Sequence, residues 1–481
     1  MSLSSALSNA TSGLAAASRS AETIANNVAN SMTEGYGRRE IRLVANSLGG
    51  VGNGVSVDGV SRVVNQTAMN ERRLAEAAYG SQAPKVAFYQ SLESTLGAPD
   101  QPNSISSQVS DIEAALVTAT ANPENTQQLS RVVSSFKSFA TTINSASDTL
   151  KQIRESADQG ISESVKTLNT SLKSIEDLNV QIRAVTVSNG NANGLIDERQ
   201  RVIDTISEII PIKEVPSSYG TVRILTPNGT TLVDNEAAQF SFSSSYPITP
   251  DMTVASGALS ELTLSGAAST AGTVDSIIEG GSLSSQFEVR DKLAVEEQTR
   301  LDTLAETLVN QFSTASLDPT LSAAPGLFTD AGGSITPGNE LGLAGRLTVN
   351  PAIDPAQGGE VWRLRDGIGA TTPGPVGNRE IISGLNNLMK GNEPDGSQSP
   401  NNSVLSISTG IVSAITGERI SSESVQAYFS SNSIVFKQIE LEAGVDTDQE
   451  LQELLLVEQS YAANAQILAT IDEMLQSLLR I

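Results

Sequence analysis

The chain of 481 residues carries 30 Lys plus Arg against 54 Asp plus Glu, a formal net charge of −24. Such a surface repels nucleic-acid phosphates and anionic lipid, so neither nucleic acid nor a membrane is an expected partner. The sequence has no cysteine and no histidine, which excludes disulfides, the usual zinc sites and nucleophiles activated by histidine. We therefore expect no metal, no cofactor and no enzymatic activity.

The N-terminal segment has the spacing of a coiled-coil helix. Its apolar residues recur at alternating intervals of four and three, the pattern of helices that pack side by side. Only Arg19 and Glu22 are charged between Met1 and Thr33, whereas a helix in water normally has a charged outer face. We expect this helix to be buried on more than one side. The seam consists of Leu3, Leu7, Ala10, Leu14, Ala17, Ala21, Ile24 and Val28.

The same segment does not have the composition of a secretory signal. Residues 1–18 contain no Lys or Arg and are mostly Ser and Ala, unlike the basic and apolar regions of a signal peptide. Elsewhere no window approaches 18 continuous apolar residues, so no transmembrane helix is predicted. We expect a cytoplasmic protein, or one exported without a cleaved signal peptide.

Three asparagines, Asn26, Asn27 and Asn30, interrupt the first seam just before a Gly-Tyr-Gly sequence at 35–37. An uncharged amide can form hydrogen bonds in a buried position without the cost of burying a charge. Asn30 also tolerates the left-handed conformation that often ends a helix. We expect the helix to end here and the chain to turn outward at the glycines.

The middle of the chain reads as long helices with an inserted β region. Helical spacing runs over 103–210, with breaks at Asn122-Pro123 and at 191–194. Residues 315–377 are rich in Gly, Pro and Ala, and suggest a second small β element. The other predicted elements are a helix over Leu195–Ile210, a hairpin of Thr221–Leu225 with Thr230–Val233, a helix over Leu283–Phe312, a strand over Arg346–Val349, and helices over 379–444 around a loop at 391–403.

The C-terminal segment repeats the coiled-coil spacing. Thr447 to Glu450 has the form of a capping box that starts a helix. A lone polar residue in such a seam, here Asn464, can fix the register or the partner. The seam consists of Leu454, Val457, Tyr461, Asn464, Leu468, Ile471, Leu475 and Leu478.

These patterns predict a mainly α fold with inserted β structure. The terminal helices form a coiled coil, long helices form a bundle body, and the β insertion is small. The predicted domains are 1–40 with 444–481 for assembly, 41–215 with 281–443 for the helical body, and 216–280 for the β insert.

Two interpretations of the terminal helices are open. They pair only with each other, or they pair and also pack against other copies of the chain; the near absence of charge on the first helix favours the second. The residues predicted to form the assembly interface are Leu3, Leu7, Leu14, Ile24, Val28, Asn26, Asn27, Asn30, Tyr36, Leu454, Val457, Tyr461, Asn464, Leu468, Ile471, Leu475 and Leu478.

Four motifs could suggest chemistry, and each has a simpler structural interpretation. Ser134–Lys137 is an S-x-x-K sequence without the other motifs of a serine acyl enzyme. Asp446–Glu450 begins like a calcium loop but lacks its glycine and final glutamate. Gly49–Gly54 lacks the spacing and lysine of a phosphate loop. Asp197–Arg199 is a charged helix face, and nothing indicates the facing carboxylates of a glycosidase.

Both ends carry a resemblance to a known family. Residues 25–30, ANNVAN, followed by Thr33-Glu34-Gly35-Tyr36, resemble the N-terminal signature of the bacterial flagellar axial proteins, which comprise rod, hook and hook-associated proteins. Glu34 departs from the residues common in that signature, and Gly37 replaces the Ser of the Gly-Tyr-Ser-Arg form found at the hook–filament junction. Residues 444–475 are similar to the family's C-terminal signature. Residues 52–73, the long helices of 103–185, and 195–199 fit the members of the hook–filament junction rather than rod or hook proteins.

The resemblance implies a structural role. It implies terminal helices that pack with those of neighbouring copies around a channel, Tyr36 packed against the helical body, and Arg38 and Arg39 paired with carboxylates. The implied partners are further copies, the hook protein, a second junction protein (hook-associated protein 3) and an export chaperone, and the implied location is the extracellular flagellum. The alternatives are a hook protein or other axial protein and, from another class, a secreted carboxylate-dependent hydrolase.

Overall fold

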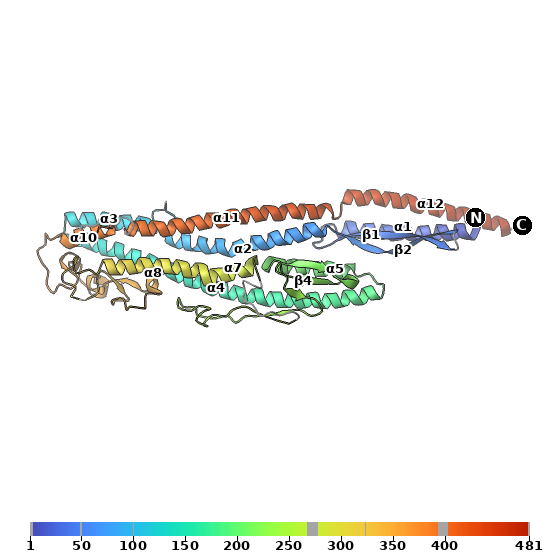
Figure 1. Cartoon of the computed structure of the whole chain (residues 1–481). Coiled ribbons are helices and arrows are strands. Elements are labelled where there is room, and N and C mark those ends of the chain that lie inside the picture. Colours follow the sequence, from blue (N-terminus) through green and yellow to red (C-terminus); the bar gives the residue numbers. More distant parts are fainter. Residues whose placement is uncertain are drawn as a thin grey trace.

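The computed structural model describes residues 3–48, 51–99, 101–266, 278–322, 324–392 and 403–479. The molecule is a long rod (Figure 1). The N-terminal helix α1 (Leu3–Ala29) and the C-terminal helix α12 (Thr447–Leu479) lie side by side at one end, and the rest of the chain forms the long body. Among the described residues no helix is both long enough and apolar enough to cross a membrane.

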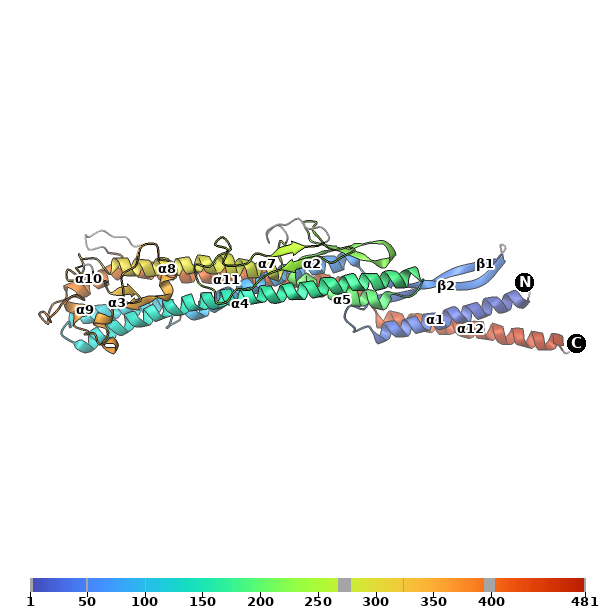
Figure 2. The same ribbon diagram turned by 90° about the horizontal axis from the view of Figure 1, so that it is seen from below.

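A β-hairpin that the sequence did not lead us to expect follows α1. Strands β1 (Arg38–Leu48) and β2 (Val51–Val63) pair antiparallel, with Arg38 opposite Val63. The hairpin extends from the body alongside α1 (Figure 2). Strand β2 is held on that helix, because the Val55 N–H donates to Ser12 Oγ at 3.2 Å. Gly54, at φ 84°, is required there, since a Cβ atom would lie 2.0 Å from the same hydroxyl.

Long helices form the body, as the apolar spacing predicts. The break at Asn122-Pro123 is confirmed, and the Asn125 side chain caps the next helix by accepting from the backbone N–H groups of Gln127 and Gln128. That helix, α4 (Thr126–Val187), runs most of the length of the body. The other long body helices are α2 (Gln66–Leu96), α3 (Ile105–Ala121), α5 (Asn193–Ile209), α8 (Ala294–Gln311) and α11 (Val404–Glu442).

Shorter elements complete the body. The helix expected over Leu283–Phe312 is present as α7 (Gly281–Glu288), a π-helical turn η2 (Val289–Leu293) and α8. The predicted loop at 391–403 lies mostly outside the described residues, between α10 (Glu380–Met389) and α11. The remaining short elements are helix α9 (Arg363–Asp366) and the 3-10 turns η1 (Ser218–Gly220), η3 (Leu343–Gly345), η4 (Pro351–Ile353) and η5 (Pro355–Gln357).

The inserted β region packs directly on the helices. Strands β3 (Lys213–Pro216), β4 (Val222–Leu225) and β5 (Thr231–Val233) form one sheet, β6 (Gln239–Ser241) pairs with β7 (Thr263–Ser265), and β8 (Phe328–Asp330) pairs with β9 (Leu347–Val349). The hairpin predicted at 221–233 and the strand predicted at 346–349 are therefore present. The Asn169 side chain of α4 bonds both the N–H and the C=O of Phe240. The predicted mainly α fold with inserted β structure is confirmed.

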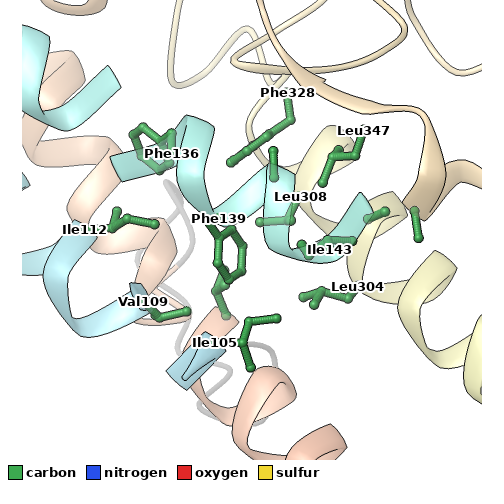
Figure 3. Packing of buried hydrophobic residues seen from close by; sticks show 14 of the residues in the cluster. Ile105, Val109, Ile112, Phe136, Phe139, Ile143, Leu304, Leu308, Phe328 and Leu347 are labelled. Carbon is green, nitrogen blue, oxygen red and sulfur yellow. The ribbon is translucent and has the colours of Figure 1, made fainter. Parts of the chain in front are cut away.

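The main core lies where α3, α4 and α8 meet the β8–β9 pair (Figure 3). The rings of Phe136 and Phe328 meet edge to face, with centroids 5.5 Å apart, and Phe312 packs against both. All three side chains are almost completely buried. Edge-to-face packing adds to the free energy gained from burying the rings.

We expect Phe136→Ala to destabilise the body strongly. The substitution leaves a cavity between Phe312 and Phe328, and large-to-small changes of this kind cost about 3–5 kcal/mol. The measurement is denaturant unfolding followed by far-ultraviolet circular dichroism. Phe136→Leu is the matched control and should cost less; equal stability of Phe136→Ala and the wild type would contradict the packing described here.

Candidate assembly interface

The two terminal helices pair along part of the predicted seams. Ala10, Ala17 and Ile24 of α1 are buried, as is Ile471 of α12. The small side chains of α1 allow the two backbones to approach closely. Leu3, Leu14, Val28, Leu454, Val457, Asn464 and Leu468 are half-buried, and Leu7, Tyr461, Leu475 and Leu478 are exposed.

Asn464 has a specific counterpart in α1. A Cβ atom built on Gly13 would lie 2.8 Å from both side-chain polar atoms of Asn464. The amide of Asn464 therefore occupies the space that a side chain at position 13 would fill. Since the glycine and the asparagine fit only when they face each other, this contact can set the register of the pair.

Much of the apolar surface of α12 is not covered in a single chain. Its described part buries only Glu450 and Ile471. Large apolar side chains on the rest of the helix remain exposed to solvent. They are Leu451, Leu455, Leu456, Tyr461, Ile467, Met474, Leu475, Leu478 and Leu479. Exposed apolar patches of this extent mark sites of association.

Asn27 is the centre of the joint between the terminal helices and the body. Its Nδ2 donates to both carboxylate oxygens of Glu450 at 3.0 Å and to the Arg39 carbonyl at 2.8 Å. Its Oδ1 accepts from the Tyr36 hydroxyl and from the Arg39 N–H, both at 2.9 Å. Asn27 and Glu450 are each only 1% exposed. The amide thus joins the end of α1, the start of β1 and the first turn of α12.

The other two asparagines have local roles in the chain. Asn26 donates to the Glu22 carbonyl and Asn30 to the Asn26 carbonyl, and both bonds are exposed. Asn30 does not adopt a left-handed conformation; Gly35 does, at φ 77°. The turn that follows α1 therefore depends on the glycine, because a glycine adopts positive φ without a steric penalty.

Arg38 connects the joint to α12, and Arg39 connects it to α5 in the body. Arg38 Nε pairs with Glu450 at 2.8 Å, and this bond raises the pKa of the guanidinium. Arg39 pairs with Asp197 of α5 at 3.1 Å, and Arg62 of β2 pairs with the same carboxylate at 2.8 Å. The expectation that Arg38 and Arg39 pair with carboxylates is therefore confirmed.

Tyr36 packs within the joint. The Arg39 guanidinium lies 4.8 Å from the ring centroid, while the hydroxyl donates to Asn27. Burial raises the pKa of the Tyr36 hydroxyl, so the group remains a hydrogen-bond donor throughout the physiological range. These contacts are with Asn27 and Arg39, and the expected packing of Tyr36 against the helical body stays a prediction.

A second set of ion pairs fixes the body next to the joint. Arg72 of α2 pairs with Glu76, Asp204 of α5 and Glu440 of α11 at 2.7–2.9 Å. The neighbouring Arg73 is 1% exposed and pairs with Asp204 and with Glu214 of β3. Between the joint and these pairs lies a cavity of about 730 Å³, lined by 31–38 and by parts of α2, α5 and α11.

None of the four chemical motifs assembles a catalytic or metal site in the described residues. Lys137 pairs with Asp354 at 2.8 Å, and Ser134 is exposed on the helix surface. Residues 49 and 50 of the glycine-rich motif lie outside the described part. Within the described ranges, no group of three or more acidic side chains is arranged to hold a metal ion.

The predicted capping box at the start of α12 is wrong. The cap is Asp446, whose carboxylate accepts from the N–H groups of Asp448 and Gln449. Glu450, expected to cap Thr447, is directed into the joint. Glu450, Asp197 and Gly13 thus make contacts within the chain that the sequence did not predict, although 446–450 and 195–199 had been considered as motifs.

Comparisons with known proteins give separate matches for the two terminal segments and for the helical body. The family model "Flagella basal body rod protein" matches residues 7–36, and "Flagellar basal body rod FlgEFG protein C-terminal" matches 442–481. "Flagellar hook-associated protein FlgK helical domain" matches 89–318. The class that these matches indicate is the axial proteins of the bacterial flagellum, to which the chain is similar over these three ranges.

Within this class, the chain is similar to flagellar hook-associated protein 1. That protein from Escherichia coli (strain K12) is 27% identical over 244 residues, which cover 49% of this chain and 44% of the relative. The Bacillus subtilis (strain 168) protein of the same name is 25% identical over 240 residues, covering 47% of each. The matched region therefore spans less than half the length of these relatives. A solved structure of the flagellar hook junction protein FlgK from Burkholderia pseudomallei has 19% identity and a TM-score of 0.44, covering 54% of this chain and 46% of that one.

We expect Asn27→Asp to loosen the joint. The new carboxylate would lie beside buried Glu450, and two carboxylates in one buried site cannot both ionise without a large penalty, of the order of 3 kcal/mol. Cleavage near residues 30–37 in limited proteolysis should rise. The effect should be greater at neutral pH than at acidic pH, where one of the two groups is protonated.

Asn26→Asp is the matched control, since Asn26 is exposed and one position away. It should leave the cleavage pattern unchanged. Adding Glu450→Gln to Asn27→Asp should restore protection. Equal protection of Asn27→Asp and Asn26→Asp would contradict the central role of Asn27.

We expect Gly13→Ala to weaken the pairing of α1 with α12, because the added methyl group displaces the Asn464 amide. The expected cost is about 1–3 kcal/mol, as for other overpacked contacts. Hydrogen exchange of the α1 amides reports the local stability. In the double variant with Asn464→Ala the methyl has space, so the two changes should not be additive; strict additivity would show that the residues do not interact.

Proposed function

We propose that this protein is a structural subunit of the bacterial flagellum that joins the hook to the filament. Its paired terminal helices would pack with those of other copies in a tubular lattice. The observation that carries the proposal is the exposed apolar face of α12, which no described part of the chain covers. Its position, in the region similar to the C-terminal segment of rod and hook proteins, supports an axial role.

The energetics favour burial of that face between copies. Burying one leucine side chain contributes roughly 1.5–3 kcal/mol, whereas association costs an estimated 4–15 kcal/mol in lost freedom. Three leucines, such as Leu455, Leu456 and Leu478, contribute roughly 4.5–9 kcal/mol, which offsets the lower part of that range, and contacts with several neighbours add to it. A closed or helical lattice provides those contacts through repeated head-to-tail interfaces.

The partners and the location follow from the same proposal. The subunit would lie outside the cell in the flagellum, with the hook protein on one side and the second junction protein, hook-associated protein 3, on the other. An export chaperone would cover the apolar face of α12 before assembly. Support comes from the relatives, which carry the name flagellar hook-associated protein 1. The relatives are named as flagellar components, which supports a role that is structural rather than enzymatic.

The body would give the junction its stiffness. It is built from long helices that run along one axis (Figure 1), with the β elements packed on their surface. The hydrogen bonds of Asn27 with Arg39 and the ion pair of Arg39 with Asp197 connect that body to the terminal helices. A bending force on the terminal helices would therefore reach the rod through a short buried joint.

We expect immunogold labelling of intact flagella from the source organism to give a narrow band where hook meets filament. A subunit that lies only between hook and filament should carry the label at that position alone. Labelling along the whole hook would instead make the chain a hook protein. Flagella without label would contradict the proposal.

A chain lacking residues 446–481 is the control. Since α12 contributes little to the body core, the shortened chain should remain folded, with the circular dichroism of the body helices. It should be absent from flagella. Its incorporation at the junction would show that α12 is not required for assembly.

A further inference from the structure

The second half of α11 carries an unused helix-packing seam. Its residues recur at the alternating spacing of four and three that also marks α1. All of them are exposed, and among the described residues no element covers them. The seam consists of Ile420, Ser424, Ala427, Ser431, Ile434, Gln438 and Leu441; we call it the α11 seam.

The opposite face of the same helix explains why the seam is unoccupied. That face packs on α2; Ser422 is buried there, and Phe429 and Phe436 are half-buried. A helix with one buried face normally presents charged residues on the other. Instead, 424–436 contains no charged residue at all, although the chain carries a net charge of −24.

Large apolar side chains flank the α11 seam. Tyr428 is 62% exposed and Val435 52%, and within the seam Ile434 is 63% and Leu441 65% exposed. The serines between them are small, so a second helix could approach closely. A helical surface that combines apolar residues, small residues and no charge is suited to a partner helix.

We infer that the α11 seam is a lateral contact surface for a second copy of this chain in the assembled flagellum; the inference rests on the proposed function. Two observations favour a copy as the occupant. The helices α11 and α12 follow each other along one edge of the rod (Figure 1), so the seam continues from Leu441 towards the exposed Leu451 and Leu455 of α12. Copies that meet through α12 therefore bring their bodies side by side along α11.

The absence of charge is the second observation. Two copies with the same strong negative charge repel wherever acidic surfaces face each other. Close contact between them requires a surface free of that charge, and 424–436 provides it. A positively charged partner, by contrast, would be expected to select an acidic surface.

The test is site-specific photo-crosslinking in flagella that contain the full chain. We expect Tyr428→p-benzoylphenylalanine to give an adduct of twice the 50.2 kDa chain mass, in which mass spectrometry finds peptides of this chain alone. Tyr246 is the matched control, because it is an 84% exposed tyrosine on the β insertion, away from the seam. The same replacement there should give no such adduct.

The outcomes separate the inference from the proposed function. Immunogold labelling first shows whether each variant is in the flagellum; if the chain is absent, the proposed function fails and the inference with it. If the chain is present at the junction and the Tyr428 adduct contains the hook protein or another protein, or does not form, the inference is wrong while the proposed function stands.

A charge placed directly beside the α11 seam gives an independent measurement. We expect Val435→Glu to lower the shear force at which filaments detach, since the carboxylate would be buried or repelled at the contact. Val180→Glu is the matched control, because Val180 is 62% exposed on α4. Equal detachment in both variants and the wild type would overturn the inference.

Discussion

The structure depends on one buried contact between the two ends of the chain. Asn27 and Glu450 are 423 positions apart, and their side chains bond directly. The neutral amide offers donors to the carboxylate and an acceptor to the backbone of β1, so each polar atom of the Asn27 side chain finds a partner without adding a charge at this buried position. Without this contact α1 and α12 would be joined by a thin seam of alanines and half-buried leucines. The joint therefore decides where the terminal pair begins and in which direction it leaves the body.

From this joint a series of ion pairs runs into the rod. Arg39 and Arg62 share Asp197 on α5, and about two turns further along the same helix Asp204 pairs with Arg72 and Arg73. These pairs are largely shielded from water, so they are screened less by salt than surface pairs. Removing Asp197 would leave the mostly buried Arg39 and Arg62 without their carboxylate, which is strongly unfavourable. Elements distant in sequence thus move as one unit, as a subunit that carries a mechanical load requires.

The long helices could be predicted because the apolar residues of each buried face recur at helical intervals within a short stretch of sequence. The apolar spacing of the body helices repeats every three to four residues. Asn122-Pro123 ends α3, because a proline cannot continue the hydrogen bonding of a helix. The β1–β2 hairpin could not be predicted, because its strands are mostly exposed. In addition, β2 includes Gly52, Gly54 and Gly59, and glycine is depleted in strands. The residues that pair across the joint could not be predicted either. Nothing in local sequence states which of 54 acidic residues will meet Arg38. The capping box at 447–450 failed for the same reason: Asp446 was available as the cap, and Glu450 had a stronger partner at a distance.

The distribution of charge reconciles a strongly acidic chain with self-assembly. Free copies repel through their acidic surfaces, which keeps them apart before assembly. The helices that would meet in a lattice each contain a long run without charge, at 3–18 in α1, 424–436 in α11 and 459–471 in α12. Burial of such runs between copies carries no desolvation penalty for charge, while the acidic groups remain in water on other faces. Repulsion then opposes encounters in the wrong orientation more than those in the right one. Specificity would arise from where charge is absent as much as from where apolar side chains are present.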